Sequence, residues 1–266
     1  MIMTQVTALE IKNITKVFEL GGGNRVTAVQ DVNFKVEQNS ICVLLGPSGC
    51  GKSTILRMMA GLEIPTKGEI AIGGRTVDGP GRDRGMVFQA YTSFDWLSVR
   101  KNVEFGMKIN GIDPDERRER AERFINLVGL GKFADVYPSQ LSGGMRQRVA
   151  IARTLANDPE VLLMDEPFGA LDAETRWLMQ ELMINVAEQT NTTMVIVTHD
   201  LEEAIFLADK IVFLSSHPGR VKEEIVPEFK QGQRIADKER AVKLDGYAEL
   251  ESRLMRLMRE EGRGVE

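Results

Sequence analysis

Residues 46–54 read GPSGCGKST, and this G-x-x-x-x-G-K-S/T pattern is typical of a loop that binds a nucleoside triphosphate. Gly46, Gly49 and Gly51 allow the backbone to fold around phosphate oxygens with its N–H groups pointing inward, where a Cβ would collide. Lys52 is expected to place its charge on the β and γ phosphates. The pattern therefore predicts ATP binding.

The residues around this loop indicate a strand, a loop and a helix in succession. Residues 41–45 read ICVLL, which is typical of a buried strand, and apolar residues follow the loop at helical spacing. Ser53 is expected to ligate Mg²⁺, and Thr54 to begin a helix whose positive N-terminal end faces the anion. The predicted ATP-binding residues of the loop are Gly46, Pro47, Ser48, Gly49, Cys50, Gly51, Lys52, Ser53 and Thr54.

Two carboxylates follow another buried-strand pattern. Asp165 and Glu166 come directly after the apolar residues 161–164, and an open α/β sheet presents its ligand site at the carboxyl ends of its strands. Asp165 is expected to hold Mg²⁺ through water, and Glu166 to orient or deprotonate the water that attacks the γ-phosphate. The alternative is an acid pair at an ordinary helix start.

Two further polar residues also end predicted strands. His199 follows the apolar residues 193–197 and is expected to reach the γ-phosphate and the attacking water, although a lone histidine is often structural. Gln89 ends the strand that contains residues 86–88 and is suited to contact Mg²⁺ or the attacking water. The position of Gln89 alone supports that role only weakly. The predicted catalytic residues are Glu166, His199 and Gln89, and the predicted metal ligands are Ser53, Gln89 and Asp165.

Residues 141–147 read LSGGMRQ and suggest a second anion site. Ser142 and the N–H groups of Gly143 and Gly144 lie at a predicted helix N-terminus, which attracts phosphate. Because the first site already has its own loop, the second is expected to serve the ATP of another copy of the chain in a symmetric pair. The alternative is an ordinary N-capped helix.

Composition limits the class of protein. The chain has 266 residues, of which 42% are hydrophobic, and a formal net charge of −5, which argues against a nucleic-acid groove. It has no apolar run of eighteen residues and its N-terminus lacks a signal-like apolar core, so a cytoplasmic protein is expected. Cys42 is expected in the core. Cys50 is either a small loop residue or, beside Lys52 and a helix N-terminus, a thiol whose thiolate is favoured and whose oxidation blocks nucleotide binding.

The remaining pattern predicts the elements that position these residues. Residues 8–37 alternate between apolar and polar side chains, which indicates half-buried antiparallel strands around a glycine turn. From about residue 98 to 157 the pattern is helical, and afterwards apolar strands alternate with helices, as in a mostly parallel two-sided sheet. Residues 228–266 form an amphipathic tail, for which packing against its own domain is favoured over a regulatory contact.

Taken together, the chain closely resembles the ATP-binding subunits of ATP-binding cassette (ABC) transporters over residues 8–226. The resemblance rests on the phosphate loop, Gln89, LSGGMRQ, the VLLMDE sequence that ends at Glu166, the Gly169-Ala170-Leu171-Asp172 loop and His199. It implies a P-loop α/β fold with a mostly parallel core sheet, an antiparallel β subdomain and an inserted helical subdomain. An ABC ATP-binding domain is thus expected over residues 1–227, with the helical subdomain at 98–157.

The resemblance also implies how the copies work together. It implies a homodimer that sandwiches ATP, in which Ser142, Gly143 and Gly144 of one protomer close on the nucleotide of the other, with ATP and Mg²⁺ as cofactors. Asp172 would couple the two sites across the dimer. Phe18 matches the position of the residue that stacks on adenine, which is often tyrosine in this family.

Several stretches narrow the resemblance to bacterial importers of nitrate, sulfonates, taurine and related small anions. They are residues 88–99, 102–106 and 216–220. Many of those relatives have proline where Asp95 stands, in a loop where a membrane subunit would dock. The nearby aromatic residues fit either ordinary packing or that docking groove; they are Phe88, Tyr91, Phe94 and Trp96.

The expected function is therefore the ATP-hydrolysing subunit of an importer, bound peripherally to transmembrane permease subunits at the cytoplasmic face of the cell membrane. A periplasmic or lipid-anchored solute-binding protein would be an indirect partner, and no nucleic acid is expected. One alternative is a non-transport ABC ATPase acting in DNA repair or translation, although this single acidic cassette lacks coiled-coil insertions. Another is a binding module without turnover, against which the intact Lys52, Asp165, Glu166 and His199 argue.

Overall fold

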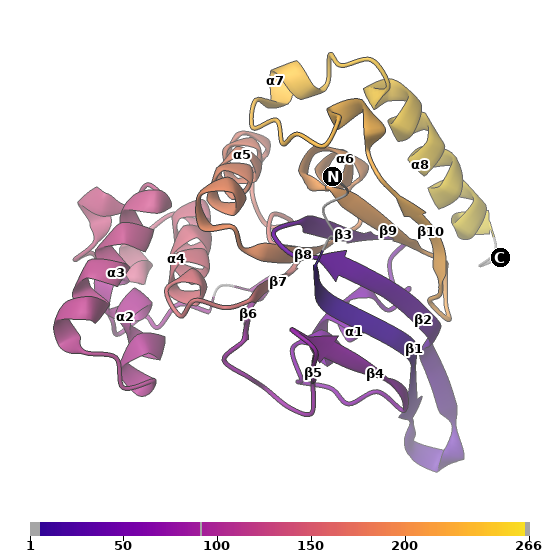
Figure 1. Cartoon of the computed structure of the whole chain (residues 1–266), viewed down its shortest axis with the longest axis horizontal. Coiled ribbons are helices and arrows are strands. Elements are labelled where there is room, and N and C mark those ends of the chain that lie inside the picture. Colours follow the sequence, from indigo (N-terminus) through magenta and orange to yellow (C-terminus); the bar gives the residue numbers. More distant parts are fainter. Residues whose placement is uncertain (1–5, 91, 264–266) are drawn as a thin grey trace.

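The computed structural model describes residues 6–90 and 92–263, and it contains two β-sheets with helices packed around them (Figure 1). The larger sheet has six strands in the order β10-β9-β3-β8-β7-β6. The neighbouring strands from β9 to β6 run parallel, and β10 pairs with β9 in the antiparallel direction. The strands are β3 (Ile41–Leu45), β6 (Arg84–Val87), β7 (Val161–Asp165), β8 (Thr193–Thr198), β9 (Lys210–Leu214) and β10 (Val221–Ile225).

This sheet is covered on both faces, which explains its continuous apolar strands. Every residue of β3, β7 and β8 is buried. Because successive side chains point to opposite faces, Val43 and Leu45 enter one apolar cluster, whereas Cys42 and Leu44 enter the other. The expected two-sided parallel sheet is therefore confirmed.

The smaller sheet is antiparallel and has the strand order β2-β1-β4-β5. Its strands are β1 (Thr7–Glu19), β2 (Arg25–Glu37), β4 (Lys67–Ile72) and β5 (Arg75–Thr76). A short 3-10 helix, η1 (Gly21–Gly23), joins the first two strands. The alternation in residues 8–37 thus correctly predicted a half-buried antiparallel pair. Helix α1 (Lys52–Met59) shares an apolar cluster with this sheet.

A group of helices lies beyond β6 and β7 at one end of the molecule, on the left of Figure 1. It contains α2 (Val99–Ile109), α3 (Pro114–Leu127) and α4 (Gly143–Leu155), with η2 (Gly131–Phe133) and η3 (Pro138–Gln140) between the last two. Asp113 caps α3, and Pro114 takes its first position, where proline is favoured. The helices predicted within residues 98–157 are therefore present, as α2, α3 and α4.

The rest of the chain returns to the core sheet and ends in a helix that packs on it. Helix α5 (Ala173–Thr190) precedes β8, and α6 (Leu201–Leu207) follows it. The tail contains η4 (Glu228–Lys230), α7 (Lys238–Ala241) and α8 (Tyr247–Arg263). Four residues of α8 are buried in the core cluster, namely Tyr247, Leu250, Leu254 and Leu257. The tail packs on its own chain as expected, and the division at residue 227 stays a prediction.

Three local expectations differ from the structure. Helix α1 begins at Lys52 instead of Thr54, because Gly51 adopts the left-handed conformation at the N-cap. Strand β6 ends at Val87, before Phe88. Strand β10 was not predicted, because its sequence VKEEI is dominated by charges; they suit the exposed edge of a sheet.

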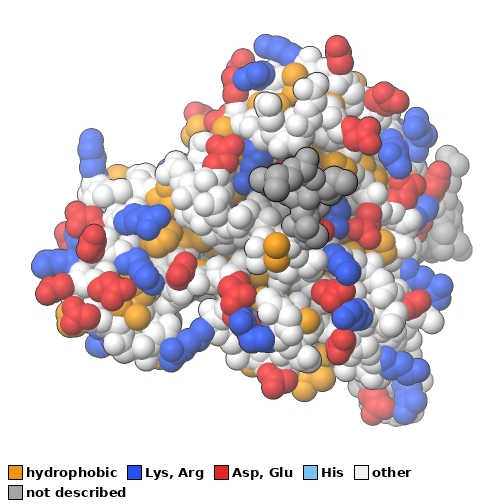
Figure 2. Space-filling model, in the orientation of Figure 1, with side chains coloured by type: hydrophobic (Ala, Val, Ile, Leu, Met, Phe, Trp, Pro, Cys, Tyr) orange, Lys and Arg blue, Asp and Glu red, His pale blue; other side chains and the backbone are white. Residues whose placement is uncertain are grey.

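The surface carries mixed charge. Figure 2 shows Lys and Arg side chains interspersed with Asp and Glu over the face seen in Figure 1. No continuous basic stripe crosses that face, which agrees with the net charge of −5. In the part of the chain that the structure describes, no helix is long and apolar enough to cross a membrane.

One buried cation joins the tail to the core. Lys230 is only 6% exposed, and its Nζ donates to the carbonyl oxygens of Phe206 and Ala208, each at 2.7 Å, at the end of α6. Burial lowers the pKa of Lys230 to about 7. A neutral amine still has two N–H groups, enough for both carbonyls.

This buried lysine should make stability depend on pH. Between about pH 7 and the ordinary lysine pKa of about 10.4, the unfolded chain binds a proton that the native chain does not, so the Lys230 contribution to the free energy of unfolding rises with pH. Urea unfolding of the wild type and of Lys230→Met at pH 7 and pH 9.5 would measure it. We expect a larger rise for the wild type; equal rises would contradict the prediction.

Candidate nucleotide-binding and hydrolysis site

The predicted catalytic residues meet because they follow four neighbouring strands. At their carboxyl ends, the parallel strands β3, β8, β7 and β6 carry the phosphate loop, His199, Asp165-Glu166 and Gln89, respectively. The carboxyl ends of parallel strands lie at one edge of a sheet. Segments from residue 46 to residue 199 therefore form one site at that edge.

The phosphate loop has the backbone that its glycines suggested. Gly49 and Gly51 have φ angles of 79° and 93°, in the left-handed region that favours glycine. A Cβ at Gly51 would overlap the Val29 side chain of β2, so glycine is also required by the close approach of that strand. Gly46 is buried against Cys50 and Leu214.

Lys52 lies inside this loop. It is 5% exposed, and its Nζ donates to the carbonyl oxygens of Gly46 and Pro47, each at 2.8 Å. These bonds hold the ammonium against the backbone that the motif predicts will surround a phosphate. Phosphate oxygens would accept stronger, charge-assisted hydrogen bonds from the same group.

Two predicted metal ligands from distant segments are in contact. The Ser53 hydroxyl donates to Asp165 Oδ1 at 2.8 Å, which joins the start of α1 to the end of β7. Hydroxyl and carboxylate oxygens are the ligands that Mg²⁺ prefers, with phosphate oxygens and waters in the remaining positions. The residues present thus fit a Mg²⁺ ion held jointly with a nucleotide.

Glu166 lies between the other two predicted catalytic residues. Its Oε1 lies 3.1 Å from His199 Nδ1, and its Oε2 accepts a hydrogen bond from Gln89 Nε2 at 3.5 Å. The backbone of Glu166 is left-handed, with φ of 43°, and its N–H donates to the Val197 carbonyl at 3.0 Å. Gln89 therefore contacts the carboxylate, a contact that the sequence did not specify.

A buried network fixes the segment that carries His199. The Thr198 hydroxyl donates to Glu203 Oε2 at 2.7 Å and accepts from the Asp200 N–H at 3.0 Å. Asp200 caps α6 by accepting from the Glu203 N–H at 3.1 Å. Glu203 is only 3% exposed, and burial raises its pKa. These contacts hold the backbone on both sides of His199.

Of the two interpretations of Cys50, the structure favours a small loop residue over a reactive thiol. This residue is 1% exposed, and burial raises the pKa of its thiol above the ordinary value even though Lys52 acts in the opposite direction. A buried thiol with a raised pKa reacts poorly with oxidants. Cys50 therefore fits the loop as a small buried residue, the first of the two interpretations.

The LSGG segment lies apart from the phosphate loop of its own chain. Ser142 caps α4, and its Oγ accepts from the Met145 N–H at 3.3 Å. Figure 1 places α4 in the helical group, away from α1. Within residues 6–90 and 92–263, no hydrogen bond joins Ser142, Gly143 or Gly144 to residues 46–54.

Asp172 caps α5, the helix that approaches the LSGG segment. It accepts from the Thr175 N–H at 3.0 Å, and that hydrogen bond lowers the pKa of Asp172. A Cβ at Gly144 would overlap the Thr175 side chain, so α4 approaches α5 closely at its first turn. Phe18 lies on β1 with the Lys16 ammonium 5.0 Å from its ring centre, and its stacking on adenine stays a prediction.

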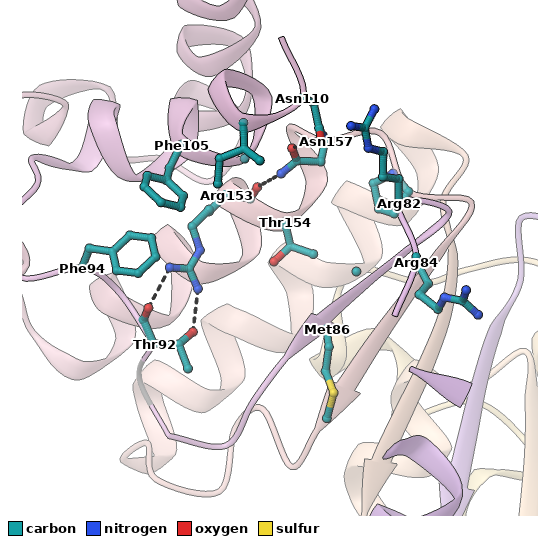
Figure 3. A pocket seen from close by; sticks show the side chains of 15 residues that line it. Arg82, Arg84, Met86, Thr92, Phe94, Phe105, Asn110, Arg153, Thr154 and Asn157 are labelled. Carbon is teal, nitrogen blue, oxygen red and sulfur yellow. Dashed lines mark hydrogen bonds between the residues drawn. The ribbon is translucent and has the colours of Figure 1, made fainter. Parts of the chain in front are cut away.

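A pocket lies between the core sheet and the helical group (Figure 3). It has a volume of about 480 Å³. On its floor, the Arg153 guanidinium donates twice to Thr92, at 2.7 Å each, and lies 5.0 Å from the Phe94 ring centre. Phe94 packs on Phe105, with ring centres 4.5 Å apart. Hydrogen bonds and ring contacts thus order the side chains on this side of the pocket.

Some of the predicted aromatic residues are packed and one is exposed. Phe94 and Phe88 are partly buried, whereas Trp96 is 72% exposed. Asn102 is fully buried and holds this loop by accepting from the Phe94 N–H at 2.8 Å and donating to three carbonyl oxygens. Tyr91 lies outside the described residues.

The fold and the site together define a P-loop ATPase with a helical insertion. The family model described as ABC transporter matches residues 29–169, more than half of the chain. The chain belongs to this ABC transporter family. It is an ATP-binding, ATP-hydrolysing subunit of the kind that the family contains.

Relatives match most of the chain. An uncharacterised ABC transporter ATP-binding protein of Methanocaldococcus jannaschii is 53% identical over 81% of this chain and 80% of its own length. The nitrate import ATP-binding protein of Synechocystis sp. is 48% identical over 82% of this chain and 81% of its own. The taurine import ATP-binding protein of Pelagibacter ubique is 45% identical over 80% of each.

A solved structure supports the fold. It is a dimeric ATP-binding cassette in a post-hydrolysis state, bound to ADP and Pi. It is 34% identical with a TM-score of 0.72, and the match covers 82% of this chain and 98% of that one. The fold class predicted from the sequence is thereby confirmed.

Several residues that hold the site and the adjacent loop through hydrogen bonds were not predicted from the sequence. Thr198 and Glu203 were not singled out, although Asp200-x-x-Glu203 has the spacing of a helix capping box. Arg153 and Asn102 were also missed. Arg153 binds Thr92, 61 positions earlier, and Asn102 binds the loop of residues 94–98; no local pattern marks such contacts.

Proposed function

We propose that this ABC ATPase energises the import of a small anion such as nitrate, a sulfonate or taurine. The observation that carries its catalytic part is the meeting of four strand ends, where Glu166 contacts both His199 and Gln89. The transport part is supported by the names of the relatives, which describe nitrate and taurine import. Those names also favour transport over a role in DNA repair or translation.

In the proposed reaction, Lys52 binds the β and γ phosphates and Glu166 removes a proton from the attacking water. His199 lies 3.1 Å from the carboxylate and orients the γ-phosphate and that water. Gln89 holds the other carboxylate oxygen. Ser53 and Asp165 would hold Mg²⁺, which neutralises phosphate charge when bound. Thr198 and Glu203 keep His199 in place.

The proposed active unit is a homodimer with two composite sites. Ser142, Gly143 and Gly144 present a capped helix N-terminus that suits the phosphates of the partner's ATP. Asp172 caps the neighbouring helix α5 and would couple the two sites. The separation of LSGG from its own phosphate loop and the dimeric relative support this arrangement.

The pocket beside the helical group is the proposed docking site for the permease subunits. Two of its lining residues, Thr92 and Phe94, follow Gln89 closely in the chain, so movement of Gln89 at the catalytic site would reach the pocket. Ile109, which lines the pocket, is 66% exposed, and Trp96, whose ring centre lies 5.2 Å from that of the lining residue Phe94, is 72% exposed. Exposed apolar groups beside a formed pocket are typical of protein contacts. The proposed location is the cytoplasmic membrane surface, with a solute-binding protein as indirect partner.

Ile109→Glu should weaken docking, because a carboxylate would be buried against an apolar partner. We expect at least a ten-fold loss of subunit bound to its permease in pull-down from detergent-solubilised membranes. Ile64→Glu is the matched control, since Ile64 is equally exposed, at 69%, outside the pocket. Equal retention of both variants would place the docking surface elsewhere.

Uptake in proteoliposomes tests the whole proposal. Vesicles containing the permease pair, this subunit and the binding protein encoded with them would be loaded with ATP and Mg²⁺ and supplied with labelled nitrate, taurine or an alkanesulfonate. We expect ATP-dependent accumulation of one of these anions. ATP hydrolysis without accumulation of any of them would contradict the proposed substrate class.

A further inference from the structure

The turn between β9 and β10 lies on the smaller sheet, directly behind the phosphate loop. The Gly219 N–H donates to the Ala28 carbonyl at 3.0 Å, and the Gly219 carbonyl accepts from the Gln30 N–H at 2.9 Å. Gly219 thus forms an isolated parallel bridge with Val29 of β2. Arg220 adds a bond of 2.6 Å to the Gln30 side chain. The turn therefore joins the two sheets.

This bridge packs so closely against the phosphate loop that no additional side-chain atom fits between them. A Cβ at Gly219 would overlap the Cys50 carbonyl oxygen. On the other side of the bridge, a Cβ at Gly51 would overlap Val29 and meet the Ala28 carbonyl at 3.0 Å. The backbone of Cys50 and Gly51 consequently rests on the bridge, and a shift of the turn would move the residues that precede Lys52.

The last turn of α8 holds this turn in place. Glu261 Oε2 accepts from the Ser216 N–H at 2.7 Å and from the Ser216 hydroxyl at 2.9 Å. Its Oε1 accepts from Lys222 Nζ at 2.7 Å. The Glu261 side chain is only 13% exposed, so these bonds are largely protected from water. The buried face of α8 fixes the helix that carries this carboxylate.

We propose that Glu261 is a positioning residue for the phosphate loop. Through Ser216 it holds the Ser215–Arg220 turn on β2, and the Val29–Gly219 bridge in turn keeps the backbone of Cys50 and Gly51 in its phosphate-binding conformation. The tail helix thereby sets the affinity for ATP from outside the nucleotide site. This inference rests on the proposed role of the phosphate loop.

The chain offers close controls for this role. Glu260 is adjacent in sequence and pairs with the same Lys222 at 3.0 Å, but its side chain is 61% exposed, and in the described structure it makes no bond to Ser216. Lys222→Met removes both ion pairs and leaves the two Ser216 bonds. Glu261→Gln keeps one oxygen that can accept from Ser216.

The test is the Kd for ATP with Mg²⁺, measured by titration calorimetry on the full chain well below the melting temperature of each variant. We expect Glu261→Ala to raise the Kd at least about five-fold, the lower end of typical coupling between sites. Turnover at saturating ATP should change little, so the loss appears in KM instead of kcat. Glu260→Ala and Lys222→Met should stay within two-fold of the wild type, and Glu261→Gln should recover most of the affinity.

Hydrogen exchange supplies a second readout that a merely structural role would not produce. In Glu261→Ala, peptides covering Gly219 and Cys50–Gly51 should exchange faster, whereas Glu260→Ala should match the wild type. A wild-type Kd in Glu261→Ala, with only a lowered melting temperature, would overturn the positioning role. Equal loss of affinity in Glu260→Ala would overturn it as well.

Lys52→Ala separates this inference from the proposed function. If the wild type binds ATP and Lys52→Ala does not, the phosphate loop has its proposed role, and the Glu261 variants decide the positioning role alone. If the wild type and Lys52→Ala bind ATP equally, the proposed function of the loop fails and the positioning role fails with it.

Discussion

Glu166→Gln is expected to reduce ATP turnover by about 10²–10⁴-fold while leaving ATP binding intact. The amide has nearly the shape of the carboxylate and keeps one oxygen, but it cannot take a proton from the attacking water. The substitution also removes a negative charge close to the bound phosphates, which favours the closed, ATP-bound dimer. The variant should therefore accumulate as an ATP-bound dimer, detected by gel filtration with ATP and by phosphate release.

Glu174→Gln provides the matched control. Glu174 lies exposed in the first turn of α5, outside the site. Its replacement by glutamine makes the same chemical change at a neighbouring carboxylate. It should behave as the wild type in both measurements. A Glu166→Gln protein that hydrolyses ATP normally would exclude the general-base role, and one that stays monomeric with ATP would count against the sandwich.

Lys52→Ala and Ser142→Arg should each inactivate a homodimer, but a mixed dimer of the two should keep one intact site. In the composite arrangement, the phosphate loop of the Ser142→Arg protomer meets the unaltered LSGG segment of the Lys52→Ala protomer. The other site carries both defects. Loss of the lysine charge from a site that binds several phosphate charges should lower ATP affinity by 100-fold or more, about 3 kcal/mol.

The measurement uses the two variants with different affinity tags, purified in tandem as the heterodimer. We expect ATP retention at one site per dimer and phosphate release above that of either homodimer. Inactivity of the mixed dimer equal to that of both homodimers would count against shared sites. Melting curves of each variant would show that Ser142→Arg, which alters the cap of α4, remains folded.

The core of the site was predictable because its residues lie in short, contiguous motifs. Lys52, Asp165 and His199 each follow an apolar run that indicates a buried strand, and parallel strands place their carboxyl ends together. The order of the strands was not needed for that conclusion. The contact of Gln89 with Glu166 was beyond the sequence, since it depends on β6 lying beside β7.

The supporting contacts were not predictable, for a physical reason. Glu261 and Ser216 are 45 positions apart, and their meeting depends on how α8 packs on the sheet. Likewise, the charge of Lys52 and the helix N-terminus suggested a reactive Cys50, but complete burial of the thiol dominates. Burial is a property of the assembled fold, so the sequence alone left both interpretations of Cys50 open.

The contact of Gly144 with Thr175 has a mechanical consequence. Thr175 also donates its N–H to Asp172, so one residue links the LSGG segment and the loop before α5. The two loops expected to face the partner thus share a single support without space for a methyl group. A displacement of one of these loops would therefore press on the other, so each protomer would present both to its partner in a linked arrangement.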